Sequence, residues 1–354
     1  MPQLGVSGKL PAGKYLERNR KSDVNQSSAA ARLPAPPSQV GGFEWRLLTA
    51  QDASAFANLL HRIEKHDSLP YRTAEAEIEE IIRQSSACTL IGGFVHDQLR
   101  CYGLVRIVSS QENTAVCQGG VDPIMRGRGL GAILVSWQTA QARHLLAGAK
   151  LSSRQISFHV EQGHADLEGH LRALGYHWER TFYDLRVFLT DTEPENGLPR
   201  FLTLESWEDL EEESILAVAN QIRREHQAQV PISLETWLAG RDDFNPDWSF
   251  VAVDRSGDRL RPVGFVMASK YYQDWSVLGW REGTIDMLAV LPGYREGGRA
   301  ARALIARSMR AQFQDGMEAT SAGVSSANNS QALSVYEALG FDTVGTTRVY
   351  ALQV

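Results

Sequence analysis

One eleven-residue pattern occurs twice in this sequence, at residues 121–131 and again at residues 290–300. Both copies read V-x-P-x-x-R-x-x-G-x-[G/A], and their arginines, Arg126 and Arg295, are 169 residues apart. In each copy an apolar, strand-like run leads into the pattern, and apolar residues at helical spacing follow it. A chain that repeats such an element is expected to be a duplication of one unit.

The elements around the two copies follow the same order. Each half reads as a strand, a helix, a strand pair and a third strand into the pattern, then a helix, a strand, a short helix and a closing strand. We therefore predict an α/β (α+β) fold with two tandem domains: an N-terminal domain at residues 43–190, a linker rich in turn formers and acids at residues 191–199, and a C-terminal domain at residues 200–354. Residues 1–42 hold five of the 13 prolines and a low-complexity run, so they are expected to form a disordered tail.

The composition argues against some classes of binding partner and indicates a cellular compartment. The net charge of −6 and the pI near 5.9 argue against a nucleic-acid partner and against an anionic membrane surface, because both require a basic face. Three cysteines without a C-x-x-C pair predict neither a disulfide framework nor a metal site, and they favour a reducing cytoplasm. No apolar run is long enough to span a membrane. The oligomeric state is open; a monomer is consistent with two domains that could pair within the chain.

The glycine-rich turn in each copy is expected to bind an anion. It opens a helix, whose first N–H groups lack intrahelical partners and whose dipole favours a phosphate or pyrophosphate. A nucleotide P-loop would need a lysine after the glycines, and neither copy has one. A dinucleotide fingerprint would need an acidic residue about 20 positions further on. Residues 132–160 contain none, so both of these nucleotide motifs are disfavoured.

The repeated pattern resembles motif A of the GNAT superfamily of acyl-CoA-dependent N-acetyltransferases. Downstream, NSQALSVYEALGF is similar to that family's closing signature, N-x-x-A-x-x-x-Y-x-x-x-G-F. The resemblance covers residues 43–354 and implies, in each domain, a bent mixed sheet that is flanked by helices and splays between its fourth and fifth strands. It also implies acetyl-CoA as cofactor, with pantetheine in the split and the pyrophosphate on the turn. The cofactor-binding residues that it implies are Leu288, Ala289, Val290, Arg295, Glu296, Gly297, Gly298, Arg299, Ala300 and Asn329, and in the first copy Val121, Arg126, Gly127, Arg128, Gly129, Leu130 and Gly131.

Catalytic groups are predicted in the C-terminal domain. Tyr336 stands at the family's proton-donor position, where a phenol could protonate a leaving thiolate; alternatively its ring packs in the core. Asn329 either steadies the cofactor or caps the following helix. Many relatives carry a glutamate where this chain has Thr284. Glu282 and Asp286 lie two residues to either side, on the same strand face, and are either the candidate bases or solvent-facing acids.

The N-terminal copy departs from the family at the same positions. Leu171 stands where the tyrosine is expected, and His164 where the asparagine is expected. This half is therefore predicted to be degenerate: it binds acetyl-CoA structurally, or it binds nothing.

The resemblance implies that the acceptor enters over the loop at residues 223–237, which contains His226. The aromatic stretch at residues 271–280 is expected near the other rim, where its rings either wall a pocket or are half-buried strand residues. Asp274, Glu282 and Asp286 would suit a cationic amine. The leading hypothesis is an enzyme, an N-acetyltransferase that acts on the primary amine of a small molecule. One alternative is a non-catalytic acyl-CoA-binding regulatory module, which the missing glutamate favours. Another is an enzyme that acetylates a thiol-sugar precursor, since the tandem arrangement also resembles mycothiol synthase.

Overall fold

The structure, a computed structural model, divides into two compact units. The first unit comprises residues 10–179 and 348–354, and the second comprises residues 1–9 and 180–347. The residues that the structure describes are 5–6, 35–37, 42–73, 78–79, 81–82, 88–109, 114–147, 154–191, 197–225, 231–257, 260–326 and 330–354. Most of the predicted tail therefore lies outside the described residues.

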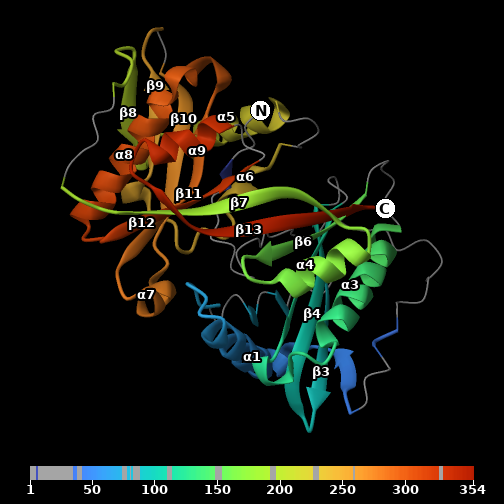
Figure 1. Ribbon diagram of the computed structural model, residues 1–354. Helices are drawn as coiled ribbons and strands as arrows, with labels where there is room; N and C mark the ends of the chain where they lie inside the picture. The colour runs from blue at the N-terminus through green and yellow to red at the C-terminus, as the bar shows by residue number, and fades with distance from the viewer. Residues whose placement is uncertain are drawn as a thin grey trace. The chain divides into compact units, whose positions relative to one another are not determined.

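The first unit is built around a mixed sheet with the strand order β2-β3-β4-β5-β6-β13. Alternate side chains of β3 and β4 point to opposite faces, so that Ile91 and Val105 pack in a core with α3, whereas Leu90 and Leu104 pack in a core with α1. Figure 1 shows α1 and α3 on opposite sides of these strands. The strands are β2 (Glu44–Leu47), β3 (Cys88–Val95), β4 (Gln98–Ser109), β5 (Thr114–Val121), β6 (Gln155–Glu161) and the end of β13 (Asp342–Gln353), and the helices are α1 (Ala53–His66), α3 (Leu130–Ala147) and α4 (Ala165–Ala173).

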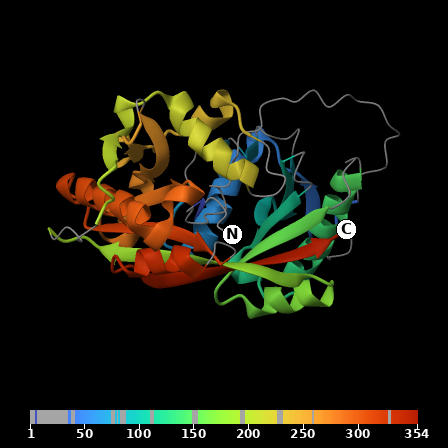
Figure 2. The ribbon, with the colours of Figure 1, turned by 90° about the horizontal axis from the view of Figure 1, so that it is seen from above.

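The second unit repeats this plan with the strand order β7-β12-β11-β10-β9-β8. Its core joins Phe265 of the sheet to Ile215 of α5 and Leu304 of α8, all fully buried. Figure 2 shows the yellow helices α5 and α6 on one side of this sheet and the orange-red α8 on the other. The strands are β7 (His177–Phe188), β8 (Leu202–Ser206), β9 (Phe250–Asp254), β10 (Arg261–Ser269), β11 (Glu282–Val290) and β12 (Ala319–Ser325), and the helices are α5 (Glu212–Glu225), α6 (Leu234–Leu238), α7 (Tyr272–Leu278), α8 (Arg299–Gln314) and α9 (Ser330–Glu337).

The closing strands of the two sequence halves are exchanged between the units. Strand β7 ends the first half of the sequence, but its residues 182–188 pair antiparallel with β12 in the second unit. The last residues of the chain lie in the first unit, where the Val354 N–H donates to the Arg154 carbonyl at 2.9 Å and the side chain of Tyr350 is fully buried. The compact units therefore differ from the predicted domains, 43–190 and 200–354, because each half of the sequence contributes its last strand to the other unit.

Each sheet contains a parallel strand pair that separates along its length. Strand β11 pairs with β12 only as far as Ile285 but continues to Val290. Likewise β5 pairs with β6 only as far as Cys117 but continues to Val121. These are the splits between fourth and fifth strands that the sequence resemblance implies. The short strand β1 (Gly5–Val6), from the predicted tail, pairs antiparallel with the split stretch of β11.

The predicted mixed α/β architecture is confirmed, and the sequence misread one segment. Tyr272 and Trp275 lie on α7, so their interpretation as strand residues is wrong. The helix ends at Gly279, whose φ of 83° forms a left-handed C-cap that glycine adopts without steric cost. The aromatic residues have a high strand propensity, which favoured the prediction of a strand although the glycine is a local signal for the end of a helix.

Candidate active site

The turn between β11 and α8 is the second copy of the repeated pattern. Two short 3-10 turns follow β11, and α8 begins at Arg299. Gly297 and Gly298 have positive φ values of 61° and 65°, which glycine tolerates. Arg295 Nε donates to the Val290 carbonyl oxygen at 2.7 Å and so ties the turn to the end of β11. The predicted cradle, a cation beside a glycine-lined helix start, is thus assembled in the second unit.

The first copy builds the same turn at the start of α3. Arg126 Nε donates to the Val121 carbonyl at 3.2 Å, Gly127 and Gly129 have φ values of 75° and 78°, and the helix begins at Leu130. The same turn is therefore present twice. In both copies an arginine side chain donates a hydrogen bond to the end of the preceding strand.

The two turns differ in the side chains that surround them. In the first copy the two terminal nitrogens of Arg126 donate to the Asp67 carboxylate at 2.6 and 2.7 Å, which offsets the positive charge of the arginine. Arg128 is exposed there, and a Cβ built on Gly131 would meet no atom within 4 Å. In the second copy a Cβ on Gly297 would approach only Arg299, at 3.9 Å, whereas a Cβ on Gly298 would meet Val335 Cγ2 at 3.0 Å and Arg302 Nη1 at 3.2 Å. The second turn is therefore open beside Gly297 and closely packed at Gly298.

A β-bulge places a carboxylate on β11. The register between β10 and β11 shifts once, and Asp286 is the additional residue in β11. One oxygen of its carboxylate accepts a hydrogen bond from Ser269 Oγ, and the other accepts one from Tyr271 Oη at 3.0 Å. Burial and then the charge of Asp286 raise the pKa of the Tyr271 phenol well above its ordinary value, so this hydroxyl stays a donor. Asp286 itself is half-buried.

Glu282, the other candidate base, is enclosed. Its side chain is 0% exposed and accepts from Arg186 Nε at 2.5 Å and from Trp280 Nε1 at 3.0 Å. An ion pair with a guanidinium stabilises the ionised carboxylate, and full burial separates it from an acceptor. Thr284, between the two acids, is also buried and shares a hydrogen bond with Ser321 Oγ at 3.2 Å. The strand face that the sequence predicted as acidic therefore presents only Asp286.

Tyr336 lies on α9 and is 4% exposed. Its ring packs edge-to-face against Phe341, with centroids 5.2 Å apart, and belongs to the core cluster of the second unit. Burial raises the pKa of the phenol, so the hydroxyl is protonated at neutral pH, as a proton donor must be. Core packing and proton donation were alternatives in the sequence; the structure shows the first, and the two are compatible. Asn329 lies outside the described residues.

The first unit has different side chains at the positions of Tyr336 and Asp286. Leu171, at the tyrosine position, is fully buried in an apolar cluster, and Cys117, at the position equivalent to Asp286, is 1% exposed. The register of β4 and β5 is regular from Ala115 to Val121, so β5 lacks the bulge that β11 has. His164 stands at the N-cap of α4. The two units therefore share the turn and differ in the groups that could move protons.

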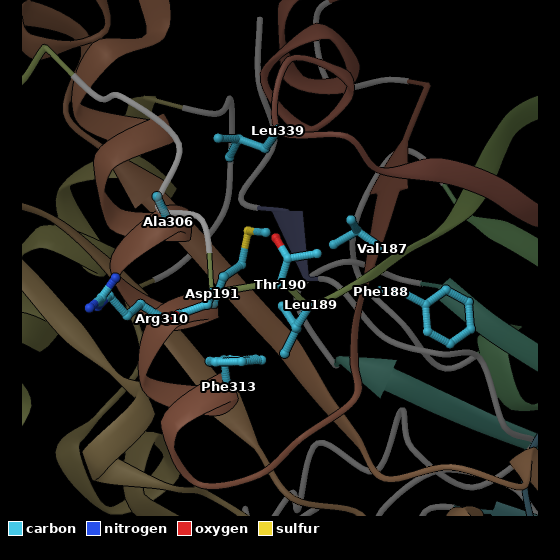
Figure 3. Close-up of a pocket in the computed structure, with 10 residues that line it drawn as sticks. Val187, Phe188, Leu189, Thr190, Asp191, Ala306, Arg310, Phe313 and Leu339 are labelled. Atoms are coloured by element: carbon cyan, nitrogen blue, oxygen red, sulfur yellow. The ribbon is translucent and has the colours of Figure 1, made fainter.

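A shallow pocket of about 90 Å³ in the second unit lies apart from these groups. Figure 3 shows it between the end of β7 and α8, with Phe313 and Leu339 among its lining side chains. No residue of the predicted site lines it. It is therefore not the predicted cofactor or acceptor site.

The model of the Acetyltransferase (GNAT) family matches residues 204–341. This range runs from β8 through the bulge and the turn to just past α9. These residues form a GNAT acetyltransferase domain. The protein is accordingly an acyltransferase, and GNAT acetyltransferases use acetyl-CoA as the acyl donor. A search of curated protein sequences finds no match to the chain.

The structure is similar to solved GNAT structures over most of its length. A GCN5-related N-acetyltransferase from Sphaerobacter thermophilus superimposes with a TM-score of 0.67 at 20% identity, covering 89% of this chain and 96% of that one. A tandem GNAT protein from the clavulanic acid biosynthesis pathway gives a TM-score of 0.63 at 15% identity, with coverages of 88% and 98%. At these identities the likeness shows the fold, which is shared with a tandem GNAT protein.

Two further observations concern the described part of the chain. None of its helices has the length and apolar character needed to cross a membrane. It also contains no group of three or more His, Cys, Asp or Glu side chains placed to hold a metal ion. Arg186 and Ser269 were not predicted from the sequence. They contact the site because their strands pair with others in the folded protein, and no local sequence pattern indicates that pairing.

Proposed function

We propose that the second unit transfers an acetyl group from acetyl-CoA to the primary amine of a small molecule. One observation carries this proposal: a single strand, β11, bears the bulge with Asp286, the backbone that separates from β12, and the Arg295-tied glycine turn. The first unit has the turn and the split but not the bulge or the carboxylate. Catalysis is therefore assigned to the second unit.

The residues of this unit fit the donor. The turn from Arg295 to Ala300, which is open beside Gly297, offers helix N–H groups and positive charge for the pyrophosphate. The end of β11, Leu288 to Val290, would present backbone groups to the amides of pantetheine in place of the pairing that β1 makes with Met287 and Leu288. When bound, acetyl-CoA supplies an acetyl group activated as a thioester. The side chains and backbone of this protein would orient the acyl group and supply the proton that the leaving sulfur takes.

Two side chains are assigned to the reacting groups. Asp286 would face the amine, whose nitrogen forms a bond to the acyl carbon as the carbon–sulfur bond breaks. Tyr336 would hold the proton that the departing sulfur takes, and solvent would restore it. A protonated amine releases one proton to water before attack, and its nitrogen releases a second to water as the amide forms. Because solvent returns one proton to Tyr336, one proton is released overall.

A non-catalytic acyl-CoA-binding module is the second candidate. The observation that favours it is the enclosure of Glu282 by Arg186, which leaves the unit with one accessible carboxylate where two were predicted. Under both candidates the first unit binds acetyl-CoA structurally or does not bind it. A thiol-sugar acceptor, as in a mycothiol synthase-like enzyme, is a variant of the first proposal.

The test is release of free thiol from acetyl-CoA in the presence of aminosugars, aminoglycosides, peptide N-termini and a thiol-sugar amine. Tyr336→Phe keeps the packed ring and removes the proton donor, so we expect kcat to fall by roughly 10²-fold or more. Calorimetry should show little change in acetyl-CoA affinity. The matched control is Tyr176→Phe, which removes a buried hydroxyl bonded to Thr139 in the first unit and should leave kcat unchanged.

Three outcomes separate the candidates. Full rate in Tyr336→Phe would overturn the assignment of the proton donor. Loss of rate in Tyr176→Phe, in protein that stays folded, would place catalysis in the first unit. Cofactor binding without thiol release for any amine would favour the non-catalytic module.

A further inference from the structure

The carboxylate of Asp286 is fixed in orientation by two hydroxyl groups. Ser269 Oγ donates to one oxygen and Tyr271 Oη donates to the other, so each oxygen accepts a hydrogen bond from a hydroxyl. Ser269 is the last residue of β10 and Tyr271 is the N-cap of α7. A carboxylate can accept about four hydrogen bonds, so two donors orient it without exhausting its capacity. Hydrogen bonds to the ionised form also favour that form over the protonated one.

The two other acids that the sequence offered to a cationic amine, Asp274 and Glu282, are closed to a ligand. Asp274 is 0% exposed and the Glu282 side chain is 0% exposed, and Glu282 is paired with Arg186. Lys270, adjacent to both hydroxyl donors, directs its ammonium to Asp315 at 2.8 Å. Of the three carboxylates that the sequence offered to a cationic amine, Asp286 is the half-buried one.

We propose that Asp286 binds the acceptor as an ammonium ion, with Ser269 and Tyr271 as positioning residues, so that the enzyme selects aliphatic primary amines over amines that are neutral at neutral pH. This inference rests on the function proposed above. An oriented, ionised carboxylate is a weak proton acceptor but a strong partner for an ammonium group. The role of Asp286 is therefore recognition of charge, and the proton leaves the bound amine to water.

Benzylamine and aniline are the probes. They differ by one methylene group, and at neutral pH benzylamine is an ammonium ion whereas aniline is neutral. Wild-type protein should have the higher kcat/KM with benzylamine. Asp286→Asn should lower kcat/KM for benzylamine by roughly 10- to 100-fold, mainly through KM, since a hydrogen bond to a charged group is lost. The value for aniline should change by less than about threefold.

The positioning residues are tested by a pH profile as well as by rate. Tyr271→Phe removes a donor that favours the ionised carboxylate, so the pKa of Asp286 rises and the acidic limb of kcat/KM for benzylamine moves to higher pH. Ser269→Ala should move it in the same direction. Other ionisable groups around this carboxylate are Glu282 on its own strand, Lys270, and Asp243, whose charge acts on Tyr271.

The control is Tyr71→Phe, which removes an equivalent bond from a buried tyrosine to a carboxylate, Glu161, at 2.8 Å in the first unit. It should leave the pH profile unchanged. Acetyl-CoA affinity, measured by calorimetry, should be unchanged in every variant and shows that the fold is intact.

The outcomes distinguish this inference from the function on which it rests. Acetylation of neither amine, together with no thiol release for any amine of the panel above, by protein that binds acetyl-CoA would remove both. Equal use of the two amines, or an equal loss for both in Asp286→Asn, would overturn ammonium recognition and leave N-acetyl transfer standing. An acidic limb that does not move in Tyr271→Phe and Ser269→Ala would overturn their positioning role alone.

Discussion

A substitution in the last strand should destabilise the unit that carries most of the first half of the sequence. Tyr350 lies four residues from the C-terminus, yet it is 0% exposed in the core of the first unit. Its hydroxyl donates to Glu168 at 2.9 Å and accepts from Arg172 at 2.8 Å, both on α4. Tyr350→Ala is therefore expected to act on residues nearly two hundred positions away in the sequence.

The magnitude follows from what the side chain contacts. Truncation of a buried aromatic ring to alanine costs about 3–5 kcal/mol. The two hydrogen bonds contribute roughly 0.5–1.5 kcal/mol each. The cost of losing them is partly offset because Glu168 also accepts a hydrogen bond from Arg348. A loss on the order of 4 kcal/mol corresponds to roughly a 10³-fold rise in the opening equilibrium.

Hydrogen exchange followed by mass spectrometry localises the loss. In Tyr350→Ala, peptides from β6 and α4 should exchange up to 10³-fold faster, whereas peptides from α5 and β9 should be unchanged. The matched variant is Leu185→Ala on β7, which is 1% exposed in the core of the second unit and should have the reverse pattern. If each substitution instead loosened its own half of the sequence, the strand exchange would be refuted.

Two other predictions concern the turn and acid stability. Arg295→Ala should weaken acetyl-CoA binding about tenfold by calorimetry, because a charge and the hydrogen bond to Val290 are lost. The equivalent variant in the first unit, Arg126→Ala, should leave turnover near wild type. The reverse result would move the functional cofactor site to the first unit. The hydrogen bonds from Arg46 hold the pKa of Asp52 at about 2, below its ordinary 3.8. Because the folded-state pKa is the lower one, this pair stabilises the protein above pH 3.8 and less as the pH falls toward 2. In urea denaturation the stability difference between wild type and Asp52→Asn should shrink over that range, and a constant difference would contradict the assignment.

Local patterns in the sequence were sufficient for the elements and for the turn. The start of α3 at Leu130 and of α8 at Arg299 follows from glycines and apolar spacing that lie within one stretch of chain. The bulge at Asp286 could not be read in this way, because it depends on the register of β10 against β11. The same holds for Arg186, which reaches Glu282 from a strand 96 residues earlier.

The strand exchange also explains why the sequence could not assign the units. Strands β7 and β13 close the two halves at equivalent places and carry similar alternating patterns, so either could complete either sheet on local grounds. The choice is made by side chains that meet only in the folded protein: Leu185 in the core of the second unit and Tyr350 in that of the first.

This exchange gives the first half of the sequence a role that does not depend on a working site of its own. Strand β7 supplies seven register pairs to β12, and its Arg186 neutralises Glu282 beside the bulge of the acetyltransferase domain. Leu171 and Cys117, at the positions equivalent to Tyr336 and Asp286, are buried in the first unit. If catalysis lies in the second unit, as proposed, it therefore depends on the first half of the sequence through β7.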